Sequence, residues 1–301
     1  MTASLTARWL TVALLTLASS MMLVPQARAV LPSESRATRY MQISAGFSHT
    51  CALRTSGTGV CWGRKQGGRT RVPAGQYTQI SAGYDHSCAV TTSGKGVCWG
   101  NNYYGEARVP PGQYTQISAG RFHSCAVTTS GKGVCWGSNY RRRANVPAGR
   151  YKQISAGGGH SCALKTSGQG VCWGWNDYDQ TTVPPGRYMQ ISAGSDHSCA
   201  LTTSGKGLCW GYEYSYGDAD GDGPSVVPPG RYTQISAGYD HSCAVTTSGE
   251  GLCWGTAPST VPTGRFTQIS AGTGFACAVT RSRKAVCWGR NDFGETRVPG
   301  R

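Results

Sequence analysis

Seven repeats of about 37 residues, a constant ten-residue spacing between paired cysteines and the absence of helical periodicity predict an all-β fold, a seven-bladed β-propeller. The stretch HSCAVTTSGKGVCWG at residues 86–100 returns unchanged at 123–137. Near copies lie at 49–63, 160–174, 197–211, 241–255 and 275–289. Each repeat contains short runs of Val, Ile, Thr, Tyr and Trp separated by Gly, Pro and Ser. This composition is typical of strands joined by turns, and it predicts short blades of three to four strands.

The two cysteines of each repeat are predicted to face each other across a β-hairpin. If Cys88 lies opposite Cys98, the remaining loop is Thr92-Ser93-Gly94, and Gly94 falls where a three-residue loop favours a left-handed backbone. In this register the cysteines form a non-hydrogen-bonded pair, where side chains approach most closely. We therefore expect one disulfide within each repeat: Cys51–Cys61, Cys88–Cys98, Cys125–Cys135, Cys162–Cys172, Cys199–Cys209, Cys243–Cys253 and Cys277–Cys287.

A closed ring explains the ends of the repeat region better than an open β-solenoid does. The region begins at YMQISAG and ends at TRVPG, whereas inside the chain VPxG runs directly into YxQISAG. The two ends are thus two halves of one junction, and ring closure also protects the strand edges. We expect a signal peptide at 1–29, an N-terminal linker at 30–39 and the propeller at 40–301.

The N-terminal segment predicts export. It has a basic residue at Arg8, an apolar run from Trp9 to Leu17 and a small-x-small cleavage pattern at Ala27-Arg28-Ala29. The alternative is an uncleaved anchor, but the apolar run is short for a membrane span of about 20 residues. The fourteen cysteines all lie in the repeats, and paired thiols suit an oxidising compartment. We expect a secreted or periplasmic, monomeric protein without a membrane span.

The net charge of the chain favours acidic partners. The formal charge is +15, and loss of Arg8 and Arg28 with the signal peptide leaves +13, because residues 1–29 contain no acidic residue. Such a balance attracts an acidic protein, a polyanion or an anionic cell surface, and it does not choose among them.

The repeat resembles a known family. The segments AGxxHSCAL and SGxGxCWGxNxxG are similar to the regulator-of-chromosome-condensation repeat, and the interleaved VPxG…QISAG is most similar to its secreted bacterial β-lactamase inhibitory protein II branch. The resemblance covers residues 40–301 and implies a seven-bladed propeller that binds other proteins. The paired cysteines depart from the usual family pattern.

The recurring histidines and tryptophans are interpreted as structural. A catalytic residue is normally present once, whereas a histidine precedes the first cysteine by two positions in six repeats, and Phe275 takes that position in the seventh. Phenylalanine can replace a packing histidine but not a base or a metal ligand. The tryptophan after each second cysteine is expected to pack between blades. No nucleophile–base arrangement stands out, so we expect a protein that is not an enzyme.

One insertion has the residues of a cation site. Asp218, Asp220 and Asp222 alternate in the longest repeat, and Gly223 follows them, as in the first half of a calcium loop. No helix flanks the segment, and Pro229 stands where a bidentate glutamate belongs, so a solvated acidic turn is the alternative. Zinc is disfavoured by the ten-residue cysteine spacing. We expect no cofactor other than this calcium ion.

Two segments of the repeat vary, one after SAG and one after CWG, whereas the TTSGKG turn hardly varies. Since successive connections alternate between the ends of an antiparallel sheet, both variable segments belong to the same face of the ring. That face is rich in residue types that dominate binding hot spots. The candidate binding residues are Tyr84, Tyr103, Tyr104, Arg121, Phe122, Arg141, Arg142, Arg143, Trp175, Tyr178, Tyr212, Tyr214 and Tyr239.

The sequence thus predicts a secreted, non-enzymatic propeller that binds a protein, an acidic one by its charge, through one variable face; inhibition of an enzyme is one form of such binding. A binder of anionic polymers, either cell-surface polysaccharide or extracellular nucleic acid, is the alternative, and it would show a steep salt dependence. An enzyme with a site at the mouth of the central channel is the second alternative.

Overall fold

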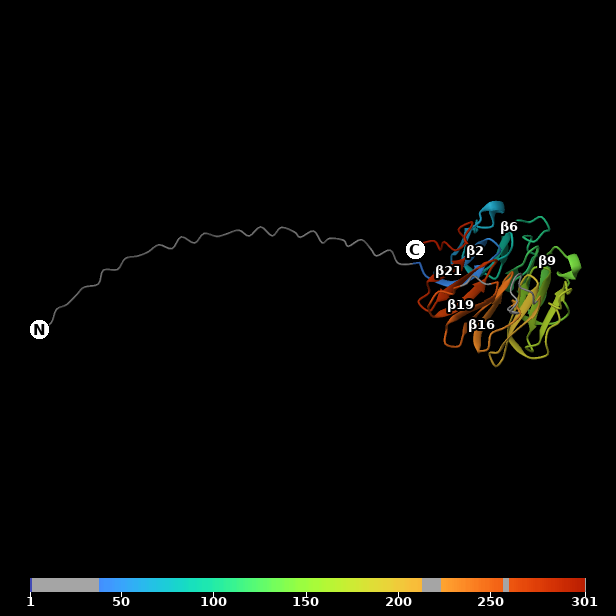
Figure 1. Cartoon of the computed structure of the whole chain (residues 1–301). Helices are drawn as coiled ribbons and strands as arrows, with labels where there is room; N and C mark the ends of the chain where they lie inside the picture. Colours follow the sequence, from blue (N-terminus) through green and yellow to red (C-terminus); the bar gives the residue numbers. More distant parts are fainter. Residues whose placement is uncertain (2–37, 213–222, 257–259, 301) are drawn as a thin grey trace. The chain divides into compact units, whose positions relative to one another are not determined.

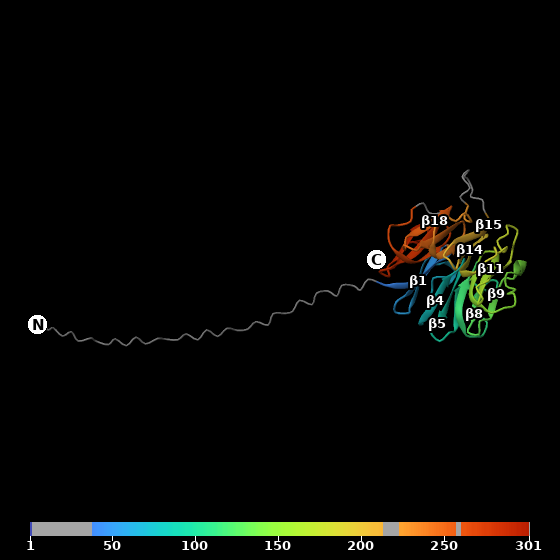
Figure 2. The same cartoon turned by 90° about the horizontal axis from the view of Figure 1, so that it is seen from below.

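The computed structural model describes residues 1, 38–212, 223–256 and 260–300. The chain divides into two units, Met1–Arg36 and Ala37–Arg301, and the second is described below. Its described strands form seven separate sheets of three strands each, which confirms the predicted seven-bladed propeller and sets three strands per blade (Figures 1 and 2). The predicted signal peptide lies, beyond Met1, outside the described residues.

Every blade repeats the same three antiparallel strands. The inner strands are β1 (Tyr40–Ala45), β4 (Tyr77–Ala82), β7 (Tyr114–Ala119), β10 (Tyr151–Ala156), β13 (Tyr188–Ala193), β16 (Tyr232–Ala237) and β19 (Phe266–Ala271). The middle strands are β2 (His49–Arg54), β5 (His86–Thr91), β8 (His123–Thr128), β11 (His160–Lys165), β14 (His197–Thr202), β17 (His241–Thr246) and β20 (Phe275–Thr280). The outer strands are β3 (Gly59–Gly63), β6 (Gly96–Gly100), β9 (Gly133–Gly137), β12 (Gly170–Gly174), β15 (Gly207–Gly211), β18 (Gly251–Gly255) and β21 (Ala285–Gly289). Short 3₁₀ turns follow two outer strands, η1 (Gln66–Gly68) and η2 (Tyr140–Arg142).

The hairpin of middle and outer strands has the predicted register and the predicted disulfide. Cys88 pairs with Cys98 across β5 and β6, and their Cα atoms are 4.0 Å apart. Gly94 has a φ of 80° in the intervening turn, where a Cβ would be strained. All seven predicted disulfides are present. So many disulfides are typical of proteins that fold outside the cytosol.

The core of the propeller lies between blades. Trp99 and Ile80 of the second blade pack against Leu53 and against the disulfide of Cys51 in the first blade, and an equivalent cluster fills each of the other interfaces. A three-stranded sheet cannot cover both of its faces, so each blade depends on its neighbours for burial. This explains why the cystine, the tryptophan and the isoleucine recur together in every repeat.

The repeated histidine connects each of the first five blades to the next one. His49 Nε2 lies 2.8 Å from Ser87 Oγ, and Ser87 Oγ donates to the carbonyl oxygen of Arg69 at 3.0 Å. Because the serine proton is used in that second bond, the histidine is the donor to the serine. Trp99 Nε1 donates to the same carbonyl at 2.8 Å. The structural role predicted for the histidines is thus a hydrogen bond to a serine hydroxyl of the neighbouring blade.

The seventh blade departs from this pattern at both ends of the bond. Phe275 replaces the histidine, and Ala276 replaces the serine that would meet His241 of the sixth blade. Accordingly, His241 Nε2 has no hydrogen-bond partner within the described part of the chain.

Glutamine and serine side chains join the inner strands around a central channel. Gln116 spans to the next inner strand, accepting from Ile154 N at 2.7 Å and donating to Ile154 O at 2.8 Å. Ser118 Oγ accepts from Ala156 N at 3.0 Å. These side chains take the place of a fourth strand for an edge that would otherwise be unpaired. The polar channel that they line has a volume of about 200 Å³.

Truncation of one glutamine in this ring tests its role. We expect Gln116→Ala to lower the free energy of unfolding by about 2 kcal/mol, because both polar groups of Ile154 lose their protein partner and keep only water. Guanidinium unfolding followed by tryptophan fluorescence measures the change. The control is Thr115→Met, because methionine occupies the equivalent position in the first and fifth blades, as Met41 and Met189. This substitution should change the free energy of unfolding by less than about 0.5 kcal/mol.

The ring closes between the first and last blades, as the two half-junctions predict. Gln268 Oε1 accepts from Ile43 N at 2.8 Å, which repeats the glutamine bridge across the closure. Tyr40 Oη donates to Pro299 O at 2.9 Å, and Trp62 Nε1 donates to Glu295 O at 2.8 Å. The blue and red segments of the figures lie side by side here (Figures 1 and 2). Within the described ranges, no helix has the length and apolar character to span a membrane.

Candidate functional site

Both variable segments lie on one face of the propeller, which we call the loop face. The residue after each CWG donates its backbone N–H to the carbonyl of a residue that follows SAG, for example Arg64 N to Ser48 O at 2.9 Å and Asn101 N to Asp85 O at 2.9 Å. The hairpin turns and the starts of the inner strands form the opposite face, which we call the turn face. The antiparallel topology therefore separates the variable part of each repeat from its uniform part.

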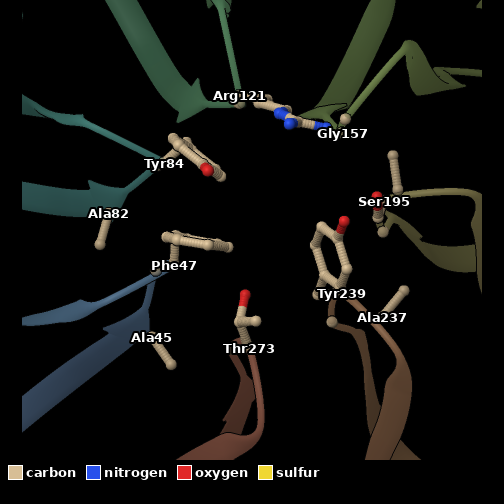
Figure 3. Close-up of a pocket in the computed structure, with 18 of the residues that line it drawn as sticks. Ala45, Phe47, Ala82, Tyr84, Arg121, Gly157, Ser195, Ala237, Tyr239 and Thr273 are labelled. Carbon is tan, nitrogen blue, oxygen red and sulfur yellow. The ribbon is translucent and has the colours of Figure 1, made fainter. Parts of the chain in front are cut away.

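The mouth of the channel opens at the centre of the loop face. The seven residues that follow SAG surround it, and we call them the mouth residues: Phe47, Tyr84, Arg121, Gly158, Ser195, Tyr239 and Thr273 (Figure 3). Tyr84 N donates to Gly120 O of the next blade at 3.1 Å, and the same bond is made by every other mouth residue except Thr273. A Cβ on Gly83 would lie 2.5 Å from Gly120 O, so the invariant glycine keeps the ring narrow. The pocket above it has a volume of about 110 Å³.

Aromatic rings form a continuous crescent from the mouth to the loop tips. Phe47 and Tyr84 are stacked with their centroids 3.9 Å apart, and Tyr239 meets Phe47 edge-on at 6.1 Å. Tyr84 continues to Phe122 at 5.9 Å, and Phe122 continues to Tyr104 at 5.4 Å. Tyr103, whose centroid lies 4.8 Å from that of Tyr104, ends the crescent and is 83 % exposed.

Arginine side chains lie over the rings of this crescent. The guanidinium of Arg121 lies 5.0 Å from the ring centre of Tyr84 and 4.9 Å from that of Phe122. Arg121 Nε has no hydrogen-bond partner in the described ranges. The guanidinium of Arg290 lies 5.7 Å from the ring centre of Phe47. At these distances the negative face of each ring attracts the guanidinium charge, so the arginines and the aromatic rings form one surface.

A second aromatic group lies on the fourth and fifth blades. Tyr178 meets Trp175 at 5.6 Å and Tyr212 at 4.9 Å between ring centres. Trp175 packs on the backbone of Gly159, where a Cβ would lie 2.6 Å from the indole ring. The glycine thus makes room for a tryptophan that occurs at this position in only one repeat.

The loop tips are held by a buried side chain that the sequence analysis did not single out. Glu106 is 1 % exposed, and its Oε2 accepts from Tyr104 N at 2.7 Å. The same contact joins Gln180 to Tyr178 N at 2.9 Å and Glu295 to Phe293 N at 2.7 Å. In each loop the acceptor follows the aromatic residue by two positions, and this spacing is the signal by which it could have been found.

Two arginines hold loops instead of facing solvent. Arg143, a predicted binding residue, is 6 % exposed and donates to Tyr140 O at 2.9 Å and to Gly158 O at 3.0 Å. Arg69 occupies the same position in the first blade and pairs with Asp85. The structure therefore corrects the expectation for Arg143: it positions a loop, because its side chain extends beneath the surface. Arg141 and Arg142 of the same loop are exposed.

The loop face carries charges of both signs. Arg141 lies 3.4 Å from Asp177, and Arg290 lies 3.3 Å from Glu295. Burial raises the pKa of the Asp196 carboxyl, which accepts from Ser195 Oγ at 3.0 Å. The basic residues expected to attract an acidic partner are thus partly neutralised on this face.

The remaining predicted site residues cannot be placed. Tyr214 and the predicted calcium ligands Asp218, Asp220 and Asp222 lie outside the described residues, so this site stays a prediction. Among the residues that the structure describes, no three His, Cys, Asp or Glu side chains gather as a metal site would require. Phe47, Arg290 and Phe293 lie on the loop face although the sequence analysis left them out of the candidate set. Alignment of the seven repeats places Phe47 at a mouth position, which is the signal that could have found it.

Comparison with known proteins identifies the repeat. The regulator of chromosome condensation (RCC1) repeat matches residues 42–68, 77–106, 114–142, 151–180, 190–217, 232–256 and 266–295. A comparison with curated protein sequences finds no match.

Several solved structures share the fold. The CRINKLY WD40 ectodomain of the receptor kinase ACR4 from Arabidopsis thaliana is 25% identical with a TM-score of 0.69, over 84% of this chain and 98% of that one. The ectodomain of the receptor kinase CR4 from Physcomitrella patens is 25% identical with a TM-score of 0.70, over 84% and 74%. Prp20p from Saccharomyces cerevisiae, described with its binding to Gsp1p and histones, is 18% identical with a TM-score of 0.66, over 84% and 83%.

Proposed function

The chain belongs to the regulator of chromosome condensation (RCC1) repeat family, and from this premise we propose that it is a non-enzymatic binding protein that recognises a protein partner through the loop face. The observation that carries the proposal is the crescent of contacting aromatic rings with arginines over it at the channel mouth. Tyrosine, tryptophan and arginine dominate the energetics of protein interfaces. Prp20p, which shares the fold, is itself described as a binder of proteins.

The construction of the loop face supports recognition by a rigid surface. Disulfides within the blades and hydrogen bonds between neighbouring inner strands hold the blades in place, so the loops are attached to a rigid scaffold. Buried acceptors such as Glu106 hold the loop tips in one conformation. A preorganised surface loses little conformational entropy when it binds, and the loss would otherwise reduce the affinity.

The mouth pocket suggests how the partner is anchored. Its volume of about 110 Å³ suits a single side chain of a partner, and its wall presents Phe47, Tyr84 and Tyr239 together with Arg121. An inserted side chain would be enclosed by aromatic surface, as hot-spot residues usually are. Inhibition of an enzyme by such an insertion is the form of this function that the resemblance to the β-lactamase inhibitory protein II branch implies.

A mouth variant tests the proposal with substitutions that the fold already accepts. Thr273 occupies a mouth position, so Phe47→Thr, Tyr84→Thr and Tyr239→Thr import a residue from the seventh blade. We expect the triple variant to recover the partner at least about tenfold less well from culture medium and cell envelope, because hot-spot truncation costs about 2 kcal/mol or more. Pull-down with quantitative mass spectrometry measures the recovery.

The control for this test changes the turn face. The control variant combines Lys95→Gln, Lys132→Gln and Lys206→Gln. Glutamine already occupies the equivalent turn position in the fourth blade, as Gln169, and the loop face stays intact. Equal recovery of every partner by the mouth variant and the parent would contradict the proposal. Release of the captured material by salt from both variants alike would instead favour the alternative, a binder of anionic polymers.

A further inference from the structure

The excess positive charge of the propeller lies on the turn face, away from the aromatic crescent. Lysines stand at the same turn position in four blades, as Lys95, Lys132, Lys206 and Lys284, and all four are exposed. Arginines precede five of the inner strands, as Arg39, Arg150, Arg187, Arg231 and Arg265, and these are exposed too. Two positions of the repeat, one in the hairpin turn and one before the inner strand, thus carry a positive charge in most blades.

Acidic residues do not balance this charge. Among the described residues of the turn face, Glu250 is the one acidic side chain, and it lies 3.4 Å from Arg265. On the loop face, in contrast, three arginines pair with acidic side chains: Arg69 with Asp85, Arg141 with Asp177 and Arg290 with Glu295. Unpaired cations on one face create a positive potential over that face alone, which attracts an anionic partner from that side.

The turn face is level because its turns are uniform. In every blade the hairpin closes in the same way, for example through Gly94 N to Thr91 O and Gly131 N to Thr128 O, at 2.9 and 2.8 Å. The start of each inner strand is tied to the preceding turn, as in the bond from Tyr114 N to Gly94 O at 2.8 Å. The cations therefore recur at equivalent positions around the ring, where a flat partner can meet more of them than a linear polymer, which meets only those along its path.

The apolar residues on this face are also those of a surface contact. Met41 and Met189, at the second position of their inner strands, are 50 % and 52 % exposed. The exposed aromatic rings on which bases would stack, such as Tyr103 and Phe293, belong to the loop face. Long flexible cations together with a few apolar side chains suit the headgroup region of a bilayer.

We propose that the turn face docks the protein on a planar surface of anionic phospholipid, with its lysines and arginines among the phosphate headgroups. The loop face then points away from the bilayer and stays free for a protein partner. This inference rests on the charge distribution and not on the proposed function, so either one can fail without the other.

The test compares two variants that lose the same charge from opposite faces. The turn-face variant combines Lys95→Gln, Lys132→Gln and Lys206→Gln, as in Gln169 of the fourth blade. The loop-face control combines Lys65→Asn, Arg141→Gly and Arg142→Gly, which imports the aligned Asn139, Gly67 and Gly68. Arg141 and Arg142 have φ values of 58° and 62°, which glycine adopts without strain. Thermal melting of both variants checks that each keeps the parental fold.

Binding is measured by co-sedimentation with vesicles of phosphatidylcholine that contain phosphatidylglycerol at about 30 mol%. We expect the parent and the loop-face control to bind these vesicles and not vesicles of phosphatidylcholine alone. Each charge near the surface contributes about fivefold to partitioning, so the turn-face variant should bind about 100-fold more weakly. Added salt should weaken binding of the parent steeply.

Three results would overturn the proposal. One is that no form of the protein binds the anionic vesicles. Another is that the two variants lose the same amount of binding, which would show that the net charge matters and its position does not. The third is binding to duplex DNA or to inorganic polyphosphate while the vesicles stay unbound, which would assign the turn face to a soluble polyanion.

Discussion

The chain is expected not to refold once its seven disulfides have been reduced and alkylated in denaturant. Each disulfide closes a hairpin with a sequence separation of 10, for which loop entropy gives about 3 kcal/mol, or about 20 kcal/mol for all seven. Folded domains usually have a free energy of unfolding of about 5–15 kcal/mol. The loss on reduction exceeds this stability, so the reduced chain should stay unfolded. Circular dichroism and tryptophan fluorescence after removal of the denaturant measure refolding, and the oxidised protein treated in parallel is the control.

Removal of a single disulfide separates the entropic account from a direct requirement for the bond. Cys125→Ala with Cys135→Ala is expected to lower stability by about 3 kcal/mol and to leave the fold intact. In the native protein the first cysteine of each pair is fully buried, so millimolar thiol should reduce the bonds only after the blades open. Spontaneous refolding of the fully reduced chain would show that packing between blades suffices without the disulfides.

Acidification from pH 7 to pH 5 is expected to destabilise the propeller by about 10 kcal/mol through its buried histidines. Burial lowers the pKa of His49 and of His197 to about 3, and that of His86 and of His160 to about 4. Burial also lowers the pKa of His123 well below its usual value of 6.5. Neighbouring Arg69 adds to the effect at His49 and His86, because its charge repels a second cation.

The sign of this dependence follows from proton uptake. The unfolded chain binds protons at these histidines below pH 6.5, whereas the folded chain excludes them until about pH 3 to 4. The stabilisation is therefore complete above pH 6.5 and is lost as the pH falls toward the folded pKa, by about 2 kcal/mol per histidine at pH 5. Guanidinium unfolding at a series of pH values measures the loss.

A histidine variant provides the control for the acid prediction. His160→Phe imports the residue of the seventh blade, Phe275, and removes one titrating group from the core. The variant should lose about 2 kcal/mol less than the parent between pH 7 and pH 5. Unfolding free energies that are the same at both pH values would contradict the account.

The sequence predicted the local architecture because its determinants lie close together in the chain. The register of Cys88 with Cys98 follows from a ten-residue spacing and a glycine that accepts a positive φ. The position of both variable segments on one face follows from the alternation of connections in an antiparallel sheet. Each of these properties depends on one hairpin or one blade. The sevenfold repetition shows which segments of the repeat are constant and which vary.

The candidate site was predicted only in part, since exposure depends on contacts between repeats. Tyr103, Tyr104 and Tyr239 are exposed on the loop face, where the sequence placed them. Arg143 belongs to an exposed-looking basic run, yet its guanidinium bonds Gly158 O of the next blade and is buried. No local pattern distinguishes it from Arg141, because the acceptor comes from another repeat.

The sequence by itself determined the blade, its disulfide, the number of blades and the face on which variation gathers. Only the tertiary structure decided which variable residues meet around the mouth, such as Phe47 with Tyr84, and that the histidine of one blade binds the serine of the next. The physical reason is the range of the interactions involved. Strand register depends on residues within one hairpin, whereas burial, ring stacking and the distribution of charge between two faces depend on blades that meet only after the ring has closed.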